Sequence, residues 1–109
     1  MDFIQYQKLA ATTAVYPKMG NNIYYPALGL AGEAGEVCGK VSKIMRDFDD
    51  EVSNTMKLEL EKELGDVLWC LSQLASELGI SLDEIAENNI RKLQSRKERN
   101  MLHGTGDNR

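Results

Sequence analysis

Two short acidic motifs in this chain place pairs of carboxylates at the same spacing. They read Glu33-Ala34-Gly35-Glu36-Val37 and Glu63-Leu64-Gly65-Asp66-Val67. Residues three apart lie on one face of a helix, so two packed helices would gather four carboxylates in one place. Four crowded negative charges repel one another unless a cation lies among them. Ligands that are all oxygen favour Mg²⁺, with Mn²⁺ as a substitute, over zinc.

The spacing of apolar residues predicts four helices that would position these motifs. The first is expected over about residues 2–15, and the second over about 25–46, after the breaks at Pro17 and Gly20. The third is expected over about 53–78, and the fourth opens with a capping box at Ser81 and Glu84 and ends near residue 100. No strand pattern competes with them. The predicted fold is therefore all-α, a four-helix bundle.

The two motifs follow the apolar stripes of the two central helices. These stripes are Ala27, Leu30, Ala34, Val37, Val41 and Ile44, and then Leu60, Leu64, Val67, Leu71, Leu74 and Leu78. Each carboxylate comes one position before a stripe residue, so all four flank the predicted seam. Packed side by side, the two helices would turn these flanks toward each other. From the spacing alone, a solvated charged face is an equal alternative.

Other residues of the same helices bear on the predicted site. Glu59 lies one turn before Glu63 on the same flank. Its alternative roles are a fifth ligand, a residue that supports the ligands, and a solvated surface residue. Glycine inside a helix costs about 1 kcal/mol relative to alanine. The second helix nevertheless contains Gly29, Gly32, Gly35 and Gly39, and the third contains Gly65. We expect these glycines to allow close backbone approach or to leave room for a ligand.

The paired motif and its surroundings resemble the signature of the MazG-like, all-α nucleoside triphosphate pyrophosphohydrolases. Glu-x-x-Glu is followed, after 26 residues, by Glu-x-x-Asp, within the segments Gly29–Val37 and Lys62–Leu68. The resemblance spans roughly Leu28 to Arg99. It implies Mg²⁺-assisted hydrolysis of a nucleoside triphosphate to a monophosphate and pyrophosphate, with a role in nucleotide-pool sanitation. It also implies a homodimer or homotetramer, with Glu33, Glu36, Glu63 and Asp66 as metal ligands and catalytic residues.

A triphosphate needs positive charge beyond the metal, and the predicted fourth helix supplies it. Its basic face resembles the C-terminal segment of the same family and contains Asn89, Lys92, Arg96 and Arg99. We expect Lys92 and Arg96 to hold phosphate oxygens and Asn89 to bind sugar or phosphate. Lys40 and Lys43 are further candidates. The alternative is a solvated basic face.

Aromatic side chains are the candidates for contact with a nucleobase, because they stack on its rings. Trp69 follows Asp66 by three residues, but a single Trp within a helix is more often core or interface, and we predict that role. Substrate selection or a contact with a partner subunit is expected from the first helix and the Tyr16–Tyr25 segment.

Composition argues against several other classes of protein. A net charge of −4 argues against a nucleic-acid partner, and the absence of a long apolar run argues against a membrane partner. With no secretory signal, we expect a cytoplasmic protein in which Cys38 and Cys70 are buried thiols. The only histidine, His103, lies near the end of the chain, which excludes a di-iron site built from Glu-x-x-His motifs. Residues 1–102 are predicted to form one helical domain, and 103–109 a mobile tail.

A different class of function is also compatible with the pattern. A strict apolar seam without histidine suits a non-catalytic dimeric bundle that binds a nucleotide or a protein partner. Such a protein would not depend on a divalent metal and would tolerate the loss of Glu63. The complete set of four carboxylates favours the enzyme.

Overall fold

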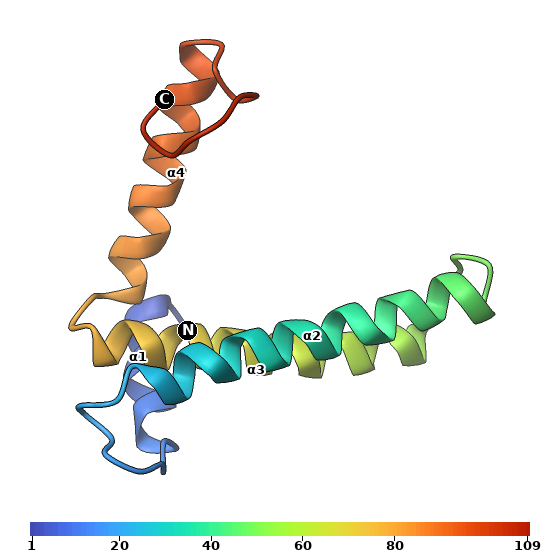
Figure 1. Ribbon diagram of the computed structural model, residues 1–109, viewed down its shortest axis with the longest axis horizontal. Coiled ribbons are helices and arrows are strands. Elements are labelled where there is room, and N and C mark those ends of the chain that lie inside the picture. The colour runs from blue at the N-terminus through green and yellow to red at the C-terminus, as the bar shows by residue number, and fades with distance from the viewer.

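The computed structural model describes all 109 residues and contains four helices and no strand (Figure 1). The helices are α1 (Phe3–Thr12), α2 (Tyr24–Asp47), α3 (Asn54–Glu77) and α4 (Leu82–Glu98). The predicted all-α fold of four helices is confirmed, and each predicted helix end lies close to the observed one. No helix combines the length and the apolar character that crossing a membrane requires.

The two long helices, α2 and α3, form the main packed unit of the molecule. They run antiparallel and lie side by side along most of their length (Figure 1). The turn between them contains Asp49 and Asp50, whose φ angles of 53° and 65° are left-handed, a conformation that Asp tolerates better than most residues. Because the turn is short, the acidic motif of α2 lies opposite that of α3.

The two shorter helices are attached at one end of this pair. α1 packs against α3 and α4, whereas α4 packs against α1 and α3 and makes no contact with α2. Figure 1 shows α4 projecting away from the α2–α3 pair. Within one chain, the four helices therefore do not close around a common core.

The start of α4 is fixed by a side chain from α1. Gln7 donates a hydrogen bond to the carbonyl of Ile80 (2.9 Å) and accepts one from the N–H of Leu82 (2.9 Å). Ser81 caps α4 by accepting from the N–H of Glu84 (3.3 Å). The reciprocal bond of the predicted capping box is not formed, because the Glu84 side chain does not return to the cap. These contacts set the direction in which α4 leaves the pair.

A single chain buries little of itself. Only 11 of its 109 residues are buried. Its accessible surface is 8153 Å², whereas a compact protein of 12.2 kDa exposes about 6,100 Å². Its radius of gyration is 16.7 Å, against about 13 Å for a compact domain of this length. Val41 and Leu64, two residues of the predicted stripes, are about half exposed. Each chain thus retains a large apolar surface.

The two cysteines differ in their environments. Cys70 is buried between the helices, as predicted. Cys38 is exposed, so the prediction of two buried thiols is wrong for this residue. It follows the stripe residue Val37 and turns onto a face of α2 that no other helix of the chain covers.

Candidate metal centre

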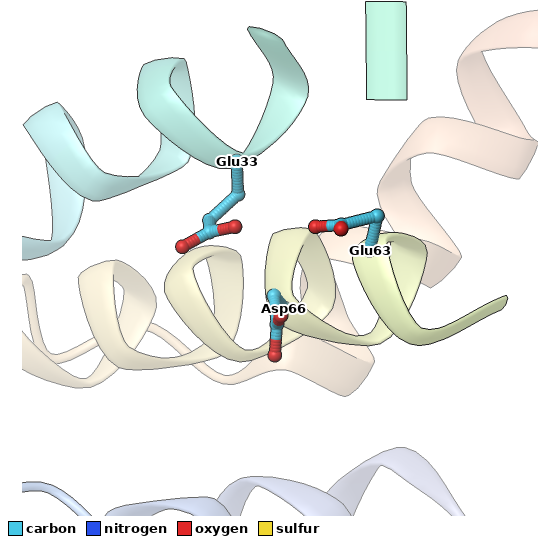
Figure 2. A group of neighbouring side chains, drawn as sticks. All are labelled: Glu33, Glu63 and Asp66. Atoms are coloured by element: carbon cyan, nitrogen blue, oxygen red, sulfur yellow. The ribbon is translucent and has the colours of Figure 1, made fainter. Parts of the chain in front are cut away.

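Three of the four predicted carboxylates meet between α2 and α3. Oxygen atoms of Glu33, Glu63 and Asp66 all lie within 4.8 Å of one another. In Figure 2, Glu33 reaches from α2 toward α3, and Glu63 turns its carboxylate toward it. The antiparallel register of the two helices brings together residues that are 30 or more positions apart in the sequence. Such a group is a suitable set of oxygen ligands for one hard divalent cation.

The charges of the three carboxylates also favour a bound cation. Partial burial raises the pKa of the Glu33 carboxyl, and repulsion by Asp66, Glu63 and Glu36 raises it further. The charged form of Glu33 is thus disfavoured by its surroundings. A bound cation would remove this penalty, so the residues fit a metal ion both in ligand type and in charge.

Glu36 is the fourth predicted carboxylate, and it lies outside the group of three. It is one turn beyond Glu33 on α2 and exposed. It is still near enough to contribute to the raised pKa of Glu33. Its role as a metal ligand stays a prediction.

Lys40 forms one edge of the acidic group. Its Nζ lies 3.5 Å from Oε1 of Glu63 and 3.9 Å from Oε2 of Glu59. Glu59 is therefore linked to the group through Lys40 and does not join it directly. A cation so close to Glu63 partly offsets the crowded negative charge. The predicted contact of Lys40 with phosphate remains a prediction.

The basic face of α4 is not brought to the carboxylates within one chain. Lys92 Nζ lies 3.3 Å from Oδ1 of Asp107, and Arg96 donates to the Asp107 carbonyl oxygen at 2.6 Å. The Arg96 side chain is only 6% exposed, whereas Asn89 is exposed. Hydrogen bonds and charge from Lys92, and then from Arg96, lower the pKa of Asp107. The last residues of the chain therefore fold back over this face.

The glycines behave differently from one another. A Cβ atom at Gly29 would lie 3.1 Å from Sγ of Cys70, so glycine allows close helix packing there. Around Gly32, Gly35, Gly39 and Gly65, nothing lies within 4 Å of the position that a Cβ would take. Close approach within the chain explains only the first of the five. The other four leave open space near the motifs.

Two aromatic residues lie beside the carboxylates: Tyr25, from the segment expected to select the substrate or contact a partner subunit, and Trp69, which was predicted to be core or interface. Tyr25 and Trp69 line a pocket that Glu33 and Asp66 also line. The signal was present in the spacing, since Tyr25 lies two turns before Glu33, and Trp69 lies three residues after Asp66. Nearby, burial raises the pKa of the Tyr6 phenol, with further contributions from Asp66 and Cys70.

Comparison with known proteins identifies the family of the chain. Residues 26–101 match the family described as the MazG nucleotide pyrophosphohydrolase domain. Since the match covers most of the chain, the protein belongs to the MazG family, whose general chemistry is nucleotide pyrophosphohydrolysis with a divalent metal.

Among curated proteins, the chain is similar to the Gene 37 protein of Mycobacterium phage L5. The two are 44% identical over 109 aligned residues, which cover 95% of this chain and 96% of the relative. The name of that relative states no activity. No solved structure matches the chain.

Proposed function

We propose that this protein hydrolyses ribo- or deoxynucleoside triphosphates to the nucleoside monophosphate and pyrophosphate, and so removes unwanted nucleotides from the pool. Mg²⁺ is the proposed cofactor, with Mn²⁺ as a substitute, and Glu33, Glu36, Glu63 and Asp66 would hold it. The observation that carries the proposal is the convergence of Glu33, Glu63 and Asp66 from two helices in a chain of the MazG family.

The chemistry of such a site follows from its charges. Mg²⁺ bound there would offset the charge of the phosphates and lower the pKa of a coordinated water. A carboxylate of the first motif, Glu33 or Glu36, orients the attacking water and accepts its proton. The water oxygen bonds to the α-phosphorus, and the bond from that phosphorus to the bridging oxygen breaks. Pyrophosphate leaves with its charge balanced by basic side chains.

Those basic side chains are proposed to be Lys40, Lys92 and Arg96, with Asn89 on the sugar or a phosphate. Lys40 already lies beside Glu63 in the same chain. The α4 residues do not, since α4 makes no contact with α2. We therefore propose that the α4 of a second copy completes the phosphate side of each site.

The surface of the chain supports self-association. The accessible surface exceeds that of a compact protein of the same mass by about 2,000 Å² per chain. Stable homodimer interfaces bury about 2,000–5,000 Å² in total, so a dimer that covers this excess falls within that range. We propose a homodimer or homotetramer in which the α2–α3 pairs of two chains pack together. Sedimentation analysis tests this directly, and a monomer at micromolar concentration would contradict it.

The reaction is tested by following pyrophosphate and orthophosphate separately. A panel of ribo- and deoxynucleoside triphosphates is incubated with Mg²⁺, and in parallel with EDTA. We expect pyrophosphate and monophosphate in equal amounts, with no orthophosphate, and no product in EDTA. If folded protein releases no pyrophosphate from any member of the panel, the proposal fails, and the non-catalytic bundle becomes the better interpretation. Orthophosphate as the product would place the cleavage at a different phosphorus.

A further inference from the structure

A pocket of about 530 Å³ opens beside the acidic group, between α2 and α3. Small-molecule sites in proteins are commonly about 300–1,000 Å³, so the pocket has the size of a ligand site. Beyond Glu33 and Asp66, its lining consists of Tyr25, Leu28, Gly29, Trp69 and Cys70. Two of the three clustered carboxylates therefore also form part of its wall. A molecule in the pocket would extend directly toward the proposed metal.

Trp69 is held in one orientation by a contact with the end of α1. Its indole N–H donates a hydrogen bond of 2.8 Å to the hydroxyl of Thr13. That hydroxyl in turn donates to the carbonyl of Ala10 at 2.8 Å. With its single polar group engaged, the indole offers a ligand its aromatic ring rather than a hydrogen bond.

Tyr25 is supported by a separate set of contacts. Its ring centroid lies 4.6 Å from that of Tyr16, with the two planes inclined at 54°. The Tyr16 hydroxyl donates to the carboxylate of Glu77 and accepts from the side-chain amide of Gln73 (3.0 Å). Asn22, which accepts from the backbone N–H of Tyr25 (3.1 Å), donates its own backbone N–H to Glu77 (3.1 Å). Both the ring and the backbone of Tyr25 are therefore anchored before any ligand arrives.

Gly29 lines the same pocket and lies against Cys70 of the facing helix. Any larger residue there would push a Cβ atom to 3.1 Å from the Cys70 sulfur. Glycine at this position therefore keeps the contact between α2 and α3 close at the pocket wall.

We propose that this pocket holds the nucleobase of the substrate, stacked on Trp69 and Tyr25, and selects bases by ring size and stacking. The inference rests on the proposed nucleotide hydrolysis, whose phosphates would lie at Glu33 and Asp66. Stacking tolerates any base because every base has an aromatic face. Strong discrimination requires polar groups that pair with the edge of a base.

Few polar side-chain groups are left for reading that edge. In the proposed site, the carboxylates of Glu33 and Asp66 would hold the metal, and the Trp69 N–H is bonded to Thr13. The hydroxyl of Tyr25 and the thiol of Cys70 remain. We therefore expect kcat/KM values for different bases to lie within about 100-fold of one another, as is usual where shape alone discriminates.

The test uses the fact that Trp69 is the only tryptophan in the chain. Its fluorescence is recorded during titration with nucleoside triphosphates whose α–β bridging oxygen is replaced by methylene, which blocks cleavage. Saturable quenching is expected with these analogues and Mg²⁺, but not with inorganic tripolyphosphate. Equal quenching by tripolyphosphate would overturn the proposal, since that ligand has phosphates and no base.

Substitution of the second aromatic residue provides a matched comparison. Tyr25→Ala should weaken analogue binding by about 10- to 100-fold, as expected for loss of one stacked ring. Phe48→Ala, at a 53% exposed aromatic residue beyond the other end of α2, should leave it unchanged. Circular dichroism and sedimentation confirm that both variants keep their helices and assembly. Equal effects of the two substitutions would overturn the assignment.

Failure of the base pocket can be separated from failure of the proposed reaction. Normal pyrophosphate release, with neither quenching nor an effect of Tyr25→Ala, would refute the pocket and leave the hydrolysis intact. Base-dependent quenching without any pyrophosphate release would support the pocket and refute the hydrolysis. If Trp69 emission changes with protein concentration but not on addition of nucleotide, a second copy covers this surface. That outcome also refutes the proposed base pocket.

Discussion

The acidic group between α2 and α3 and the basic arm, defined as the face of α4 that contains Lys92 and Arg96, are opposite in charge and differ in how they are assembled. The carboxylates converge within one chain because two long helices pair in antiparallel register. The cations of α4 lie on a helix that leaves this pair and contacts the end of its own chain instead (Figure 1). In the proposed dimer, helix pairing within one chain forms the acidic half of the site, and association between copies supplies the basic half.

The largest effect is expected from the acidic region. Glu63→Gln removes a charge from the centre of the group and should lower kcat by about 10²- to 10³-fold, as loss of one charge-stabilising group commonly does. The control is Glu61→Gln, an exposed carboxylate two residues away on α3. Pyrophosphate release in Mg²⁺ measures both. Similar rates for the two variants would show that the acidic group is not the reactive centre.

The next effect tests whether the basic arm acts between copies. Lys92→Glu alone should lower activity by about 10- to 100-fold through loss of a charged contact. When Lys92→Glu and Glu63→Gln chains are co-expressed, half of the dimers are mixed, and each mixed dimer has one intact site. Activity should therefore recover to about a quarter of that of the wild type if sites are shared across a two-fold interface.

In the control, the two variants are expressed separately and mixed only after folding, under conditions in which subunits do not exchange between dimers. No mixed dimers form there, so activity should not recover. Activity that stays at the level of the two parents after co-expression would indicate that α4 serves its own chain. The comparison between the two regions would then need a different explanation, in which α4 swings toward α2 of the same molecule.

The features that the sequence predicts correctly and those that it does not predict divide between the same two regions. Repeated 3–4 spacing of apolar residues and the turn near Asp49 are local signals, and they were sufficient to place the helices and to bring Glu33 opposite Glu63. The half-exposed Leu64 and the direction of α4 could not be derived from local spacing. Spacing predicts which face of a helix is apolar, but not whether the same chain or another one covers it.

The aromatic pocket shows a second limit of sequence reasoning. Trp69 has the spacing of a core residue and also that of a residue beside Asp66, and both descriptions fit a half-buried ring. The indole is oriented by a hydrogen bond to Thr13, a residue 56 positions away. A contact at that separation depends on how α1 crosses α3, which no local pattern encodes.

A smaller effect concerns the charge balance of the acidic region in the absence of metal. Glu33 has a folded-state pKa above its ordinary value of 4.5. Ionisation of Glu33 is therefore less favourable in the folded chain than in the unfolded chain. It costs no stability below pH 4.5, where the carboxyl is protonated in both states, and it lowers the stability as the pH rises through the raised pKa. Relative to Glu33→Gln, the wild type in EDTA should lose thermal stability between about pH 4.5 and neutrality. Melting temperatures of both proteins across this range measure the difference.

Magnesium provides the control for this pH dependence. A cation bound among Glu33, Glu63 and Asp66 offsets their repulsion, so added Mg²⁺ should raise the melting temperature of the wild type at neutral pH more than that of Glu33→Gln. An equal gain in both proteins would mean that the ion binds elsewhere. The proposal that the acidic region binds the metal would then be wrong, even if substitutions in this region lower activity.

The smallest effect is expected at the basic arm, from Asp107→Asn. Asp107 pairs with Lys92 and Arg96, the residues proposed to hold phosphate, and is itself 84% exposed. The Lys92–Asp107 pair is open to solvent and therefore weak, and Arg96 keeps its hydrogen bond to the Asp107 carbonyl oxygen. Asp107→Asn should therefore leave the melting temperature nearly unchanged. Without the Asp107 carboxylate as a competitor, Lys92 should bind phosphate more tightly. KM should therefore fall by at most a few-fold, with kcat unchanged. Initial rates across substrate concentrations measure this, with Asp50→Asn as the matched control in the α2–α3 turn. A KM that rises in Asp107→Asn alone would mean that the folded-back end of the chain helps to position α4 rather than competing with the substrate, and that the basic arm is set within its own chain after all.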